Sequence, residues 1–371
     1  MSAKNQNKAD LSTRVGGRLV SPALPVVDAS FPDANDVRFS QGLEAYSKEH
    51  IKIEAIEEIQ RRERVLNAMS QLCRLWIEGV CRDKMGLSED IVQAASGQGR
   101  NLMFTSGSFR LGVHEPGADI DSICVAPSMI TRDHFFGNII DPITGNVSKD
   151  PSSLAELIKK HPDVTNFNAV ETAAVPILTF DWEGVNIDLL FARLATSSIP
   201  PELDIDNDSV LDGVDSATEK SLNGPRVTNL IAAMVSGTPE RYQNFLFVVR
   251  CVRKWAKARG LYSNKMGYWG GVNINIAVAL VIQLYPNSSK GNLLRKFFLV
   301  FKSWRWPNPV MLCKPHDAAF GLQVWSAFTN IRDARQVRKL VARIKRKRGR
   351  SPSKIGFFTR EDSFVKSCYL Q

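Results

Sequence analysis

The sequence predicts an α/β domain built on a mixed β-sheet, followed by an all-helical domain. Up to about residue 200, short apolar runs with strand character alternate with helical patterns. After residue 225 the apolar residues recur only at helical spacing, as they do from Phe245 to Trp255. A chain of 371 residues, of which 44% are hydrophobic, is long enough to bury more than one core.

The first part of the chain is expected to form an arm, one long helix and the sheet. Residues 1–45 are polar and contain prolines without clear periodicity, so we expect a flexible arm. From Ile53 to Val80 the apolar spacing predicts a long amphipathic helix. Four runs predict strands, the last two as a hairpin: Leu102–Thr105, Asp119–Val125, Val175–Phe180 and Val185–Phe191. Residues 137–163 are rich in turn residues and predict one short helix.

The second part is expected to contain helices and no strands. Apolar residues recur at helical spacing from Phe245 to Trp255, from Ile274 to Leu284 and from Leu293 to Trp304. We expect four parts: a flexible N-terminal arm (1–45), an α/β catalytic domain (46–200), a helical central domain (201–330) and a basic tail (331–371). A cleft between two such domains is the default place for a binding site.

Three aspartates inside apolar runs form a candidate metal site. Asp119 and Asp121 lead into one apolar run, and Asp188 lies inside a later run from Asn186 to Phe191. Residues i and i+2 of a strand project from the same face, so Asp119 and Asp121 point into one space. With the strand of Asp188 alongside, like charges about 4 Å apart repel by roughly 4 kcal/mol at an effective dielectric of about 20. A pair of Mg²⁺ or Mn²⁺ ions that clamps a nucleophile and a leaving phosphate fits such a cluster.

A second D-x-D tripeptide, Asp204-Ile205-Asp206, serves as an internal comparison. Prolines precede it, no apolar strand carries it, and a calcium loop would need glycine where Ser209 stands. A D-x-D tripeptide alone is therefore weak evidence, as compatible with a solvated loop as with a site.

The bulk composition excludes several protein classes. No run of 18 apolar residues could span a bilayer, and the N-terminus lacks the hydrophobic core of a signal peptide, so we expect no membrane partner. The six cysteines are scattered without a C-x-x-C pair, which favours reduced thiols of an intracellular protein over disulfides or a zinc site.

The net charge of +10 is concentrated at one end of the chain. Residues 331–371 hold thirteen lysines and arginines against three acidic residues, so the first 330 residues balance to about zero. Such a tail is typical of an electrostatic arm for phosphates or of an import signal. The run Lys345–Arg348 is compatible with nuclear import.

Gly107-Ser108 stands where a predicted strand ends and a helix is expected to begin. Glycine lets a phosphate approach the backbone, serine adds a hydroxyl, and a helix N-terminus offers free N–H groups. Alone, such a turn is usually a plain loop. Its position shortly before Asp119 makes it a candidate phosphate contact.

This order of motifs resembles the nucleotidyltransferase superfamily that includes DNA polymerase beta. The closer resemblance is to eukaryotic nuclear poly(A) polymerases, and it extends over about residues 22–335. The segments that carry it are Phe104–His114, Gly117–Asp121, Thr131–Phe136, Val185–Leu194, Ser221–Thr228, Trp255–Lys257, Leu261–Asn264, Gly267–Val272, Gln283–Asn287 and Trp304–Val310.

The resemblance implies a role for each candidate residue. Asp119, Asp121 and Asp188 would hold two Mg²⁺ or Mn²⁺ ions, and Asp188 would also favour deprotonation of the RNA 3′-hydroxyl. Gly107 and Ser108 would contact the phosphates of the substrate ATP. Further ATP contacts would come from Asn223, Arg253, Lys257, Tyr262, Asn264, Gly271 and Val272.

Spacing alone gives these residues plainer roles. Asn223-Gly224 is typical of a turn, Gly270-Gly271 of a helix boundary, Tyr262 of a core residue and Lys257 of a solvated charge. Only the ordered set of motifs favours the functional roles.

The sequence departs from the family pattern in four places, one of which is the segment of residues 137–163, longer and more polar than the family's loop. Ser106 stands where the family has an aromatic residue, and Arg253 stands where it has a phosphate-contacting lysine. After Arg335 the match fades, so the family's adenine-reading threonine and its C-terminal RNA-binding domain are expected to be absent.

We therefore expect a template-independent RNA adenylyltransferase: a nuclear, monomeric enzyme of mRNA polyadenylation that extends RNA 3′ ends with AMP from ATP. Cleavage and polyadenylation factors are candidate partners. Two alternatives stay open, a uridylyl- or mixed-nucleotide RNA transferase and a truncated, non-catalytic form that binds RNA or partners.

Overall fold

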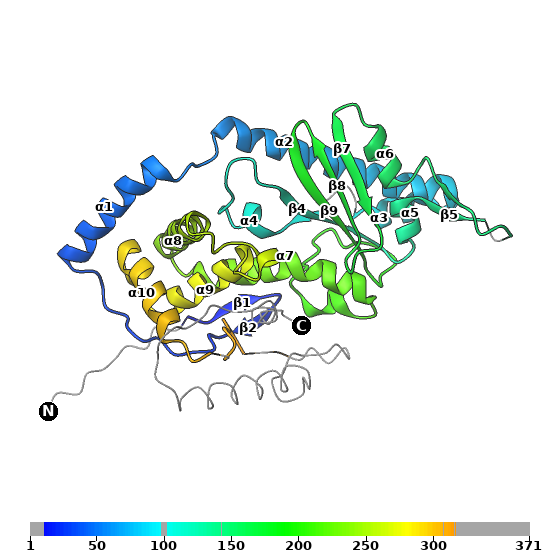
Figure 1. The fold of residues 1–371 in the computed structure, drawn as a ribbon. Helices are drawn as coiled ribbons and strands as arrows, with labels where there is room; N and C mark the ends of the chain where they lie inside the picture. Colours follow the sequence, from blue (N-terminus) through cyan, green and yellow to red (C-terminus); the bar gives the residue numbers. More distant parts are fainter. Residues whose placement is uncertain (1–10, 98–101, 142, 307, 315, 317–371) are drawn as a thin grey trace, which may run out of the picture. The chain divides into compact units, whose positions relative to one another are not determined.

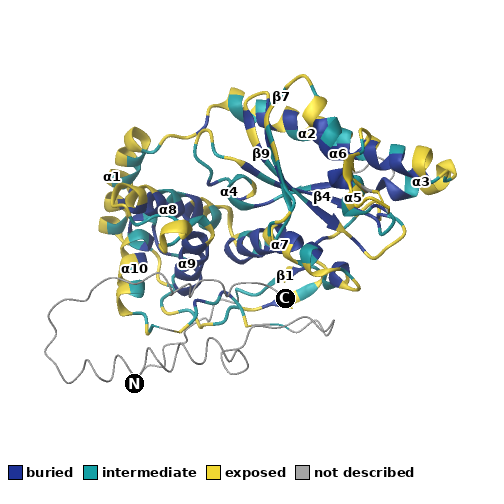
Figure 2. Ribbon diagram, turned by 45° about the vertical axis from the view of Figure 1, so that its right-hand side comes forward, coloured by how far each residue is buried: buried dark blue, intermediate teal, exposed yellow. Residues whose placement is uncertain are grey.

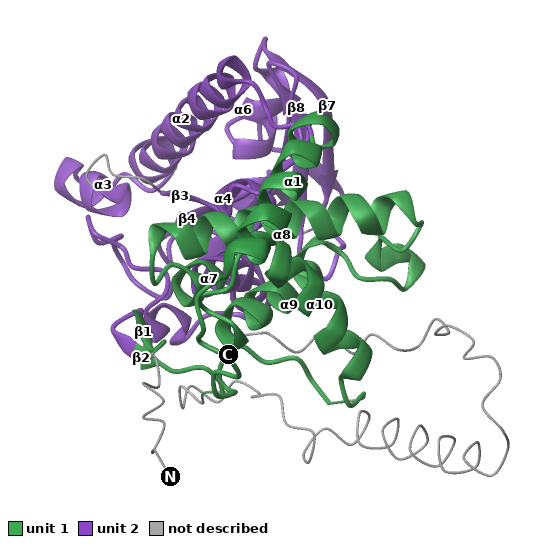
Figure 3. Cartoon of the chain, turned by 90° about the vertical axis from the view of Figure 1, so that its left-hand side faces the viewer, with its two compact units in different colours: residues 1–14, 19–51, 231–371 green, residues 15–18, 52–230 purple. Residues whose placement is uncertain are grey.

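The computed structural model describes residues 11–316, apart from residues 98–101, 142, 307 and 315. The expected basic tail, residues 331–371, lies outside the described residues. The chain divides into two compact units (Figure 3). Unit 1 consists of residues 1–14, 19–51 and 231–371, and unit 2 consists of residues 15–18 and 52–230.

Unit 2 is built around a five-stranded mixed sheet (Figure 1). Its strands lie in the order β3 (Met103–Thr105), β4 (Ile120–Ala126), β9 (Val185–Arg193), β8 (Ile177–Trp182) and β7 (Val164–Val170). β4 and β9 run parallel, and all other neighbours run antiparallel. The expected mixed sheet and its four predicted strands are therefore confirmed.

The two strands β8 and β9 form the predicted hairpin. Their turn contains only Glu183 and Gly184, with φ values of +48° and +75°, and two successive positive φ angles are typical of a tight two-residue hairpin turn. β7 was not predicted. It pairs with β8 through an irregular register between Thr165 and Asn168, and its side chains are mostly exposed or half-buried, so its apolar alternation is weak.

The predicted long helix is confirmed as α2 (Ile56–Gly79), which continues into a π-helical turn at Val80–Lys84. Trp76 on its buried face makes edge contacts with Phe135 and Phe191, at ring-centroid distances of 6.1 and 6.2 Å. These contacts attach α2 to the core of the sheet.

Shorter elements complete unit 2. The helix expected within residues 137–163 is α6 (Leu154–Lys160). The remaining elements are α3 (Glu89–Ala95), α4 (Gly107–Arg110), α5 (Arg132–Phe136), the hairpin of β5 (Asn138–Ile140) and β6 (Val147–Lys149), and a 3-10 turn at Asp208–Leu211. A further hairpin, β1 (Thr13–Val15) with β2 (Arg18–Val20), lies near the N-terminus.

The helix α7 (Ser216–Val235) occupies the segment where Asn223-Gly224 suggested a turn, although Pro225 lies inside it. Tertiary contacts made by the part of α7 in unit 2 stabilise the helix through this segment. The buried guanidinium of Arg226 donates hydrogen bonds to the carbonyl oxygens of Ile205 and Asn207, at 2.7 and 2.9 Å. Because these contacts reach back into the preceding segment, unit 2 extends to Leu230, whereas we expected a boundary after residue 200.

Unit 1 is mainly helical in its described part, and it also includes residues 13–14 of β1 and 19–20 of β2. It contains α1 (Ala34–His50), α8 (Pro239–Ala258), a 3-10 turn at Asn264–Met266, α9 (Gly271–Leu284) and α10 (Lys290–Ser303). Every residue of α9 from Asn273 to Leu284 is buried (Figure 2), and α9 packs against α8 and α10. Among the described residues after 230 there is no named strand, as expected. None of the described helices is both long and apolar enough to cross a membrane.

The expected N-terminal arm is partly folded, because residues 34–45 belong to α1. Asp33 begins this helix with a capping box that includes Asp36. The helix then packs on α10, where Gly291 N–H donates a hydrogen bond of 3.0 Å to Ser40 Oγ. A Cβ at Gly291 would lie 2.5 Å from the Phe39 ring, so this close approach requires glycine. The capping residues and the small contact residue give order to a segment whose apolar periodicity is weak.

Candidate metal and nucleotide site

The parallel pairing of β4 and β9 brings the three predicted aspartates together. Asp121 and Asp188 are direct register partners across the two strands, and Asp119 immediately precedes β4. One ligand oxygen from each carboxylate lies within 4.8 Å of the other two. The three carboxylates therefore form one cluster, as the D-x-D spacing and the predicted neighbouring strand indicated.

The carboxylates of this cluster disfavour one another's charge. Burial, together with the neighbouring charges of Asp119 and Asp188, raises the pKa of Asp121 to about 6. Burial also raises the pKa of Asp188, with a contribution from Asp119. No basic side chain contributes to either shift. An all-oxygen set of anionic ligands without an internal cation fits a hard divalent ion such as Mg²⁺ or Mn²⁺.

Gly107, the first residue of α4, lies directly against this cluster. Its φ is +64°, and a Cβ at this position would lie 2.1 Å from Asp121 Oδ2. The preceding Ser106 N–H donates a hydrogen bond of 2.8 Å to the Asp121 carbonyl oxygen. Only glycine can therefore place this turn beside the carboxylate.

The Gly107 N–H has a hydrogen-bond partner within unit 2. This N–H donates a 3.0 Å hydrogen bond to Thr228 Oγ1 of α7, so it is already engaged. The Ser108 hydroxyl has no hydrogen-bond partner among the described residues. Of the two residues, Ser108 is thus the one whose polar group is open to a phosphate.

A buried charge network fixes the loop between Gly107 and Asp119. Glu54, whose side chain is 2% exposed, accepts a 2.9 Å hydrogen bond from Arg62 Nε and lies 2.8 Å from His114 Nε2. The ring of Phe109 lies between these partners, 5.2 Å from the His114 ring and 6.0 Å from the Arg62 guanidinium. The network ties the loop to the start of α2, which limits the positions that Asp119 can take.

In unit 2, Asn223 is the other expected nucleotide contact. Its side chain is buried in α7, and its Oδ1 has no hydrogen-bond partner among the described residues. The adjacent Gly224 packs on Ser106, whose Oγ would lie 3.3 Å from an added Cβ. An unsatisfied buried acceptor next to this turn fits a residue that completes its hydrogen bonds on a ligand.

The remaining six expected ATP contacts belong to unit 1, where they form one cluster near the start of α9. An added Cβ at Gly271 would lie 3.1 Å from Arg253 Nη2 and 3.4 Å from the Tyr262 hydroxyl. Lys257 Nζ lies 5.1 Å from the centre of the Tyr262 ring. Asn264 packs against Gly270, and Val272, in the first turn of α9, is exposed.

The comparison tripeptide Asp204-Ile205-Asp206 is solvated only in part, since Asp204 is exposed and Asp206 is half-buried. Ile205 is buried, and burial raises the pKa of Asp206. Asp206 Oδ2 accepts a 3.0 Å hydrogen bond from Asn229 of α7. The segment therefore packs against α7. Within the described residues, the only cluster of acidic, cysteine or histidine side chains able to hold a metal is that of Asp119, Asp121 and Asp188.

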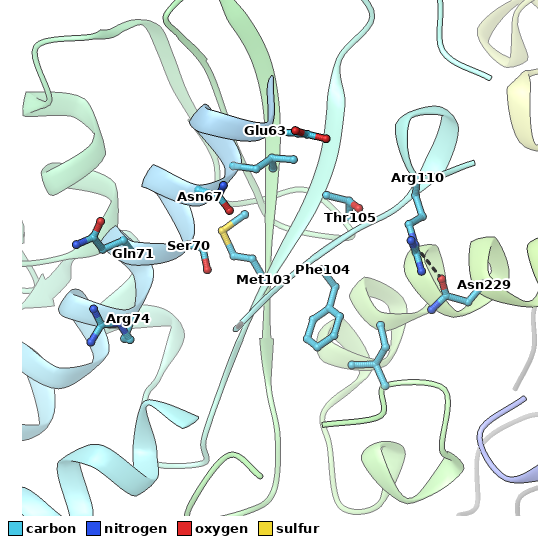
Figure 4. Close-up of a pocket in the computed structure, with 12 residues that line it drawn as sticks. Glu63, Asn67, Ser70, Gln71, Arg74, Met103, Phe104, Thr105, Arg110 and Asn229 are labelled. Atoms are coloured by element: carbon cyan, nitrogen blue, oxygen red, sulfur yellow. Dashed lines mark hydrogen bonds between the residues drawn. The ribbon is translucent and has the colours of Figure 1, made fainter. Parts of the chain in front are cut away.

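Sequence reasoning missed a polar cleft of about 840 Å³ in unit 2 (Figure 4). One wall is the polar face of α2, including Glu63, Asn67 and Arg74, and the opposite wall includes β3. Arg110, the last residue of α4, also lines it, and its Nε donates a 3.2 Å hydrogen bond to Asn229 Oδ1. Pocket-lining residues this far apart in the sequence carry no local signal.

Comparisons with known proteins agree with the geometry of both units. The family described as the poly(A) polymerase nucleotidyltransferase domain matches residues 25–235, and the poly(A) polymerase central domain matches residues 244–346. Nuclear poly(A) polymerase 1 of Arabidopsis thaliana is 40% identical over 311 residues, which are 84% of this chain and 40% of that protein.

A second relative extends the comparison beyond plants. Poly(A) polymerase of Dictyostelium discoideum is 37% identical over 297 residues, covering 80% of this chain and 34% of that protein. The chain thus spans 40% or less of the length of these relatives. A solved poly(U) polymerase structure covers 91% of this chain and all of its own, at 13% identity and a TM-score of 0.45.

Proposed function

Because the chain belongs to the poly(A) polymerase family, we propose that it is a template-independent RNA adenylyltransferase that adds AMP from ATP to RNA 3′ ends. The observation that carries this proposal is the in-register pairing of Asp121 with Asp188, which assembles three carboxylates against Gly107. The names of the plant relatives support a nuclear location. Action on mRNA as a monomer, with cleavage and polyadenylation factors, belongs to the same proposal.

In the proposed reaction the RNA 3′-oxygen forms a bond to the α-phosphorus of ATP, the bond from that phosphorus to its bridging oxygen breaks, and pyrophosphate leaves. Asp119, Asp121 and Asp188 would hold two Mg²⁺ or Mn²⁺ ions, which supply Lewis-acid stabilisation of the nucleophile and the leaving group. Asp188 would favour removal of the proton from the 3′-hydroxyl. Thr228 and Gly107 would fix the turn against which the phosphates lie.

Each unit by itself carries residues that we propose as ATP contacts. In unit 2, the open Ser108 hydroxyl would bond a phosphate oxygen, and the unsatisfied Asn223 Oδ1 would accept from a nucleotide hydroxyl. In unit 1, the cationic groups of Arg253 and Lys257 would attract the triphosphate. The other proposed ATP contacts of unit 1 are Tyr262, Asn264, Gly271 and Val272. The exposed side chain of Val272 would offer an apolar surface for adenine.

Primer extension tests the proposal. The purified chain is incubated with a labelled RNA primer, Mg²⁺ or Mn²⁺, and each of the four NTPs in turn. We expect extension with ATP and much less with the others. Equal use of UTP would replace the adenylyltransferase by a mixed-nucleotide transferase, and no extension with any NTP would refute the enzyme proposal in favour of a binding protein.

A further inference from the structure

The described helical unit carries a charge that the average over the chain conceals. Residues 231–316 contain 13 lysines and arginines and one acidic residue, Glu240. Residues 52–230 contain 16 basic and 27 acidic residues. The near-zero balance of the first 330 residues therefore combines an acidic catalytic unit with a strongly basic helical unit. The tail is not the only basic segment.

One face of α10 alternates basic and apolar side chains. Arg295, Phe298, Leu299 and Lys302 follow at spacings of three, one and three residues, which places them on one face of the helix. All four are exposed, and Phe298 and Leu299 have exposed fractions of 36% and 50%. The core face of α10 is a different one that buries Leu293 and Phe297. Phe298 and Leu299 therefore form a second apolar strip of α10, which lies on the surface and not in the core.

Trp255 of α8 extends the strip onto a second helix. Its ring meets Phe298 edge-on at a centroid distance of 4.8 Å, and 39% of Trp255 is exposed. Lys254 and Arg259 are exposed on the same end of α8. We call the combined surface the basic-aromatic face, which consists of Lys254, Trp255, Arg259, Arg295, Phe298, Leu299 and Lys302.

The cations of the basic-aromatic face are not neutralised within the described part of the chain. The side chains of Lys254, Arg259, Arg295 and Lys302 have no ion pair or hydrogen bond with a described residue. Two other lysines of α10 differ, since Lys290 pairs with Glu44 and Lys296 lies 3.6 Å from Asp28 Oδ2. The helix thus uses some cations to hold the N-terminal segment and leaves the others available for an external anion.

We propose that the basic-aromatic face binds single-stranded RNA. The proposal rests on the proposed function, because it places nucleotides of the RNA substrate on the helical unit. Exposed aromatic rings stack on bases of any sequence, and lysines and arginines around them neutralise phosphates. An acidic protein segment would satisfy the four cations, but RNA uses both the cations and the two partly exposed rings. RNA is therefore the occupant that fits the face.

Fluorescence anisotropy of the full chain with a labelled adenylate RNA of about 15 nucleotides tests the proposal, without ATP or metal and over a range of salt. The double variant Arg295→Gln/Lys302→Gln should flatten the log–log salt slope by about 1.4, because each single-strand phosphate contact contributes about 0.7. Phe298→Ala should weaken binding by about fivefold or more through lost base stacking.

A matched control removes the same charge from unit 2. Lys52 and Lys220 are exposed and have no ion pair among the described residues, so Lys52→Gln/Lys220→Gln should leave the slope nearly unchanged. An unaltered slope in Arg295→Gln/Lys302→Gln, with an unaltered melting temperature, would overturn the proposal. A variant that lost binding of a polyglutamate probe but kept RNA affinity would assign the face to an acidic protein and overturn it too.

AMP incorporation at saturating primer separates this proposal from the enzymatic one. A flattened slope in a chain that never incorporates AMP would uphold the RNA face and refute the proposed function. Normal incorporation with an unaltered slope would uphold the function and refute the RNA face.

Discussion

Gly107→Ala is expected to inactivate the proposed enzyme with only a modest loss of stability. An added Cβ would lie 2.1 Å from Asp121 Oδ2, whereas real contacts of this kind stay beyond 3.0 Å. The carboxylate must therefore move by about 1 Å, and a displacement of this size can reduce a catalytic rate by about a hundredfold. The left-handed backbone of residue 107 adds about 1–2 kcal/mol of strain once a side chain is present.

Gly112→Ala is the matched control for this variant. Gly112 has a φ of +68°, and a Cβ there would meet nothing within 4 Å. Both variants should lose about 1–2 kcal/mol, or a few degrees in melting temperature. Mn²⁺ affinity by titration calorimetry and AMP incorporation by primer extension should fall only in Gly107→Ala. Equal activity of the two variants would refute the claim that Gly107 is required by its contact with Asp121.

Four further predictions concern the same cluster and its surroundings. Asp119→Ala, Asp121→Ala and Asp188→Ala should each remove nearly all AMP incorporation, with combined losses far from additive, and Asp204→Ala should be close to silent in the same assay. Mn²⁺ affinity should fall as the pH drops below about 6, because the pKa of Asp121 is raised from 3.8 to about 6 and the proton then competes with the ion. The folded, metal-free chain holds that proton more tightly than the unfolded chain, so the contribution of Asp121 to stability should decrease as the pH rises from about 4 to about 6. In urea denaturation without metal, the stability difference between the unaltered chain and Asp121→Asn should therefore shift in favour of Asp121→Asn over this range, and a difference independent of pH would contradict the raised pKa. Glu54→Gln should lower the free energy of unfolding by about 3 kcal/mol, because Arg62 and His114 lose a buried anionic partner. An unchanged denaturation curve would contradict the structural role given to Glu54.

The sequence was sufficient for the carboxylate site because its signals are local. Asp119 and Asp121 share a face through strand periodicity, and the apolar run around Asp188 predicted the strand that pairs beside them. The helix α7 could not be predicted in this way, because Asn223-Gly224-Pro225 is locally typical of a turn. Its helical state depends on contacts such as those of Arg226 with the carbonyls of a distant loop.

Composition and charge averaged over long segments concealed two further features, the order of α1 and the opposite charges of two parts of the chain. The polar composition of residues 1–45 hid the capping box and the close contact with Gly291 that hold α1. The charge balance over the first 330 residues hid the opposite charges of residues 52–230 and 231–316. In both cases the informative signal lies in a short segment, and a long window removes it.

The parallel pairing of β4 with β9 makes the carboxylate cluster a late product of folding. Ser122 and Asp188, which hydrogen-bond across this pairing, are 66 residues apart, whereas β8 and β9 are joined by a two-residue turn. Closing a long loop costs entropy before its contacts repay it, so the hairpin is expected to form first and the three carboxylates to meet when β9 docks on β4. Divalent cations would then bind only after the rate-limiting step, and they should slow unfolding without accelerating refolding.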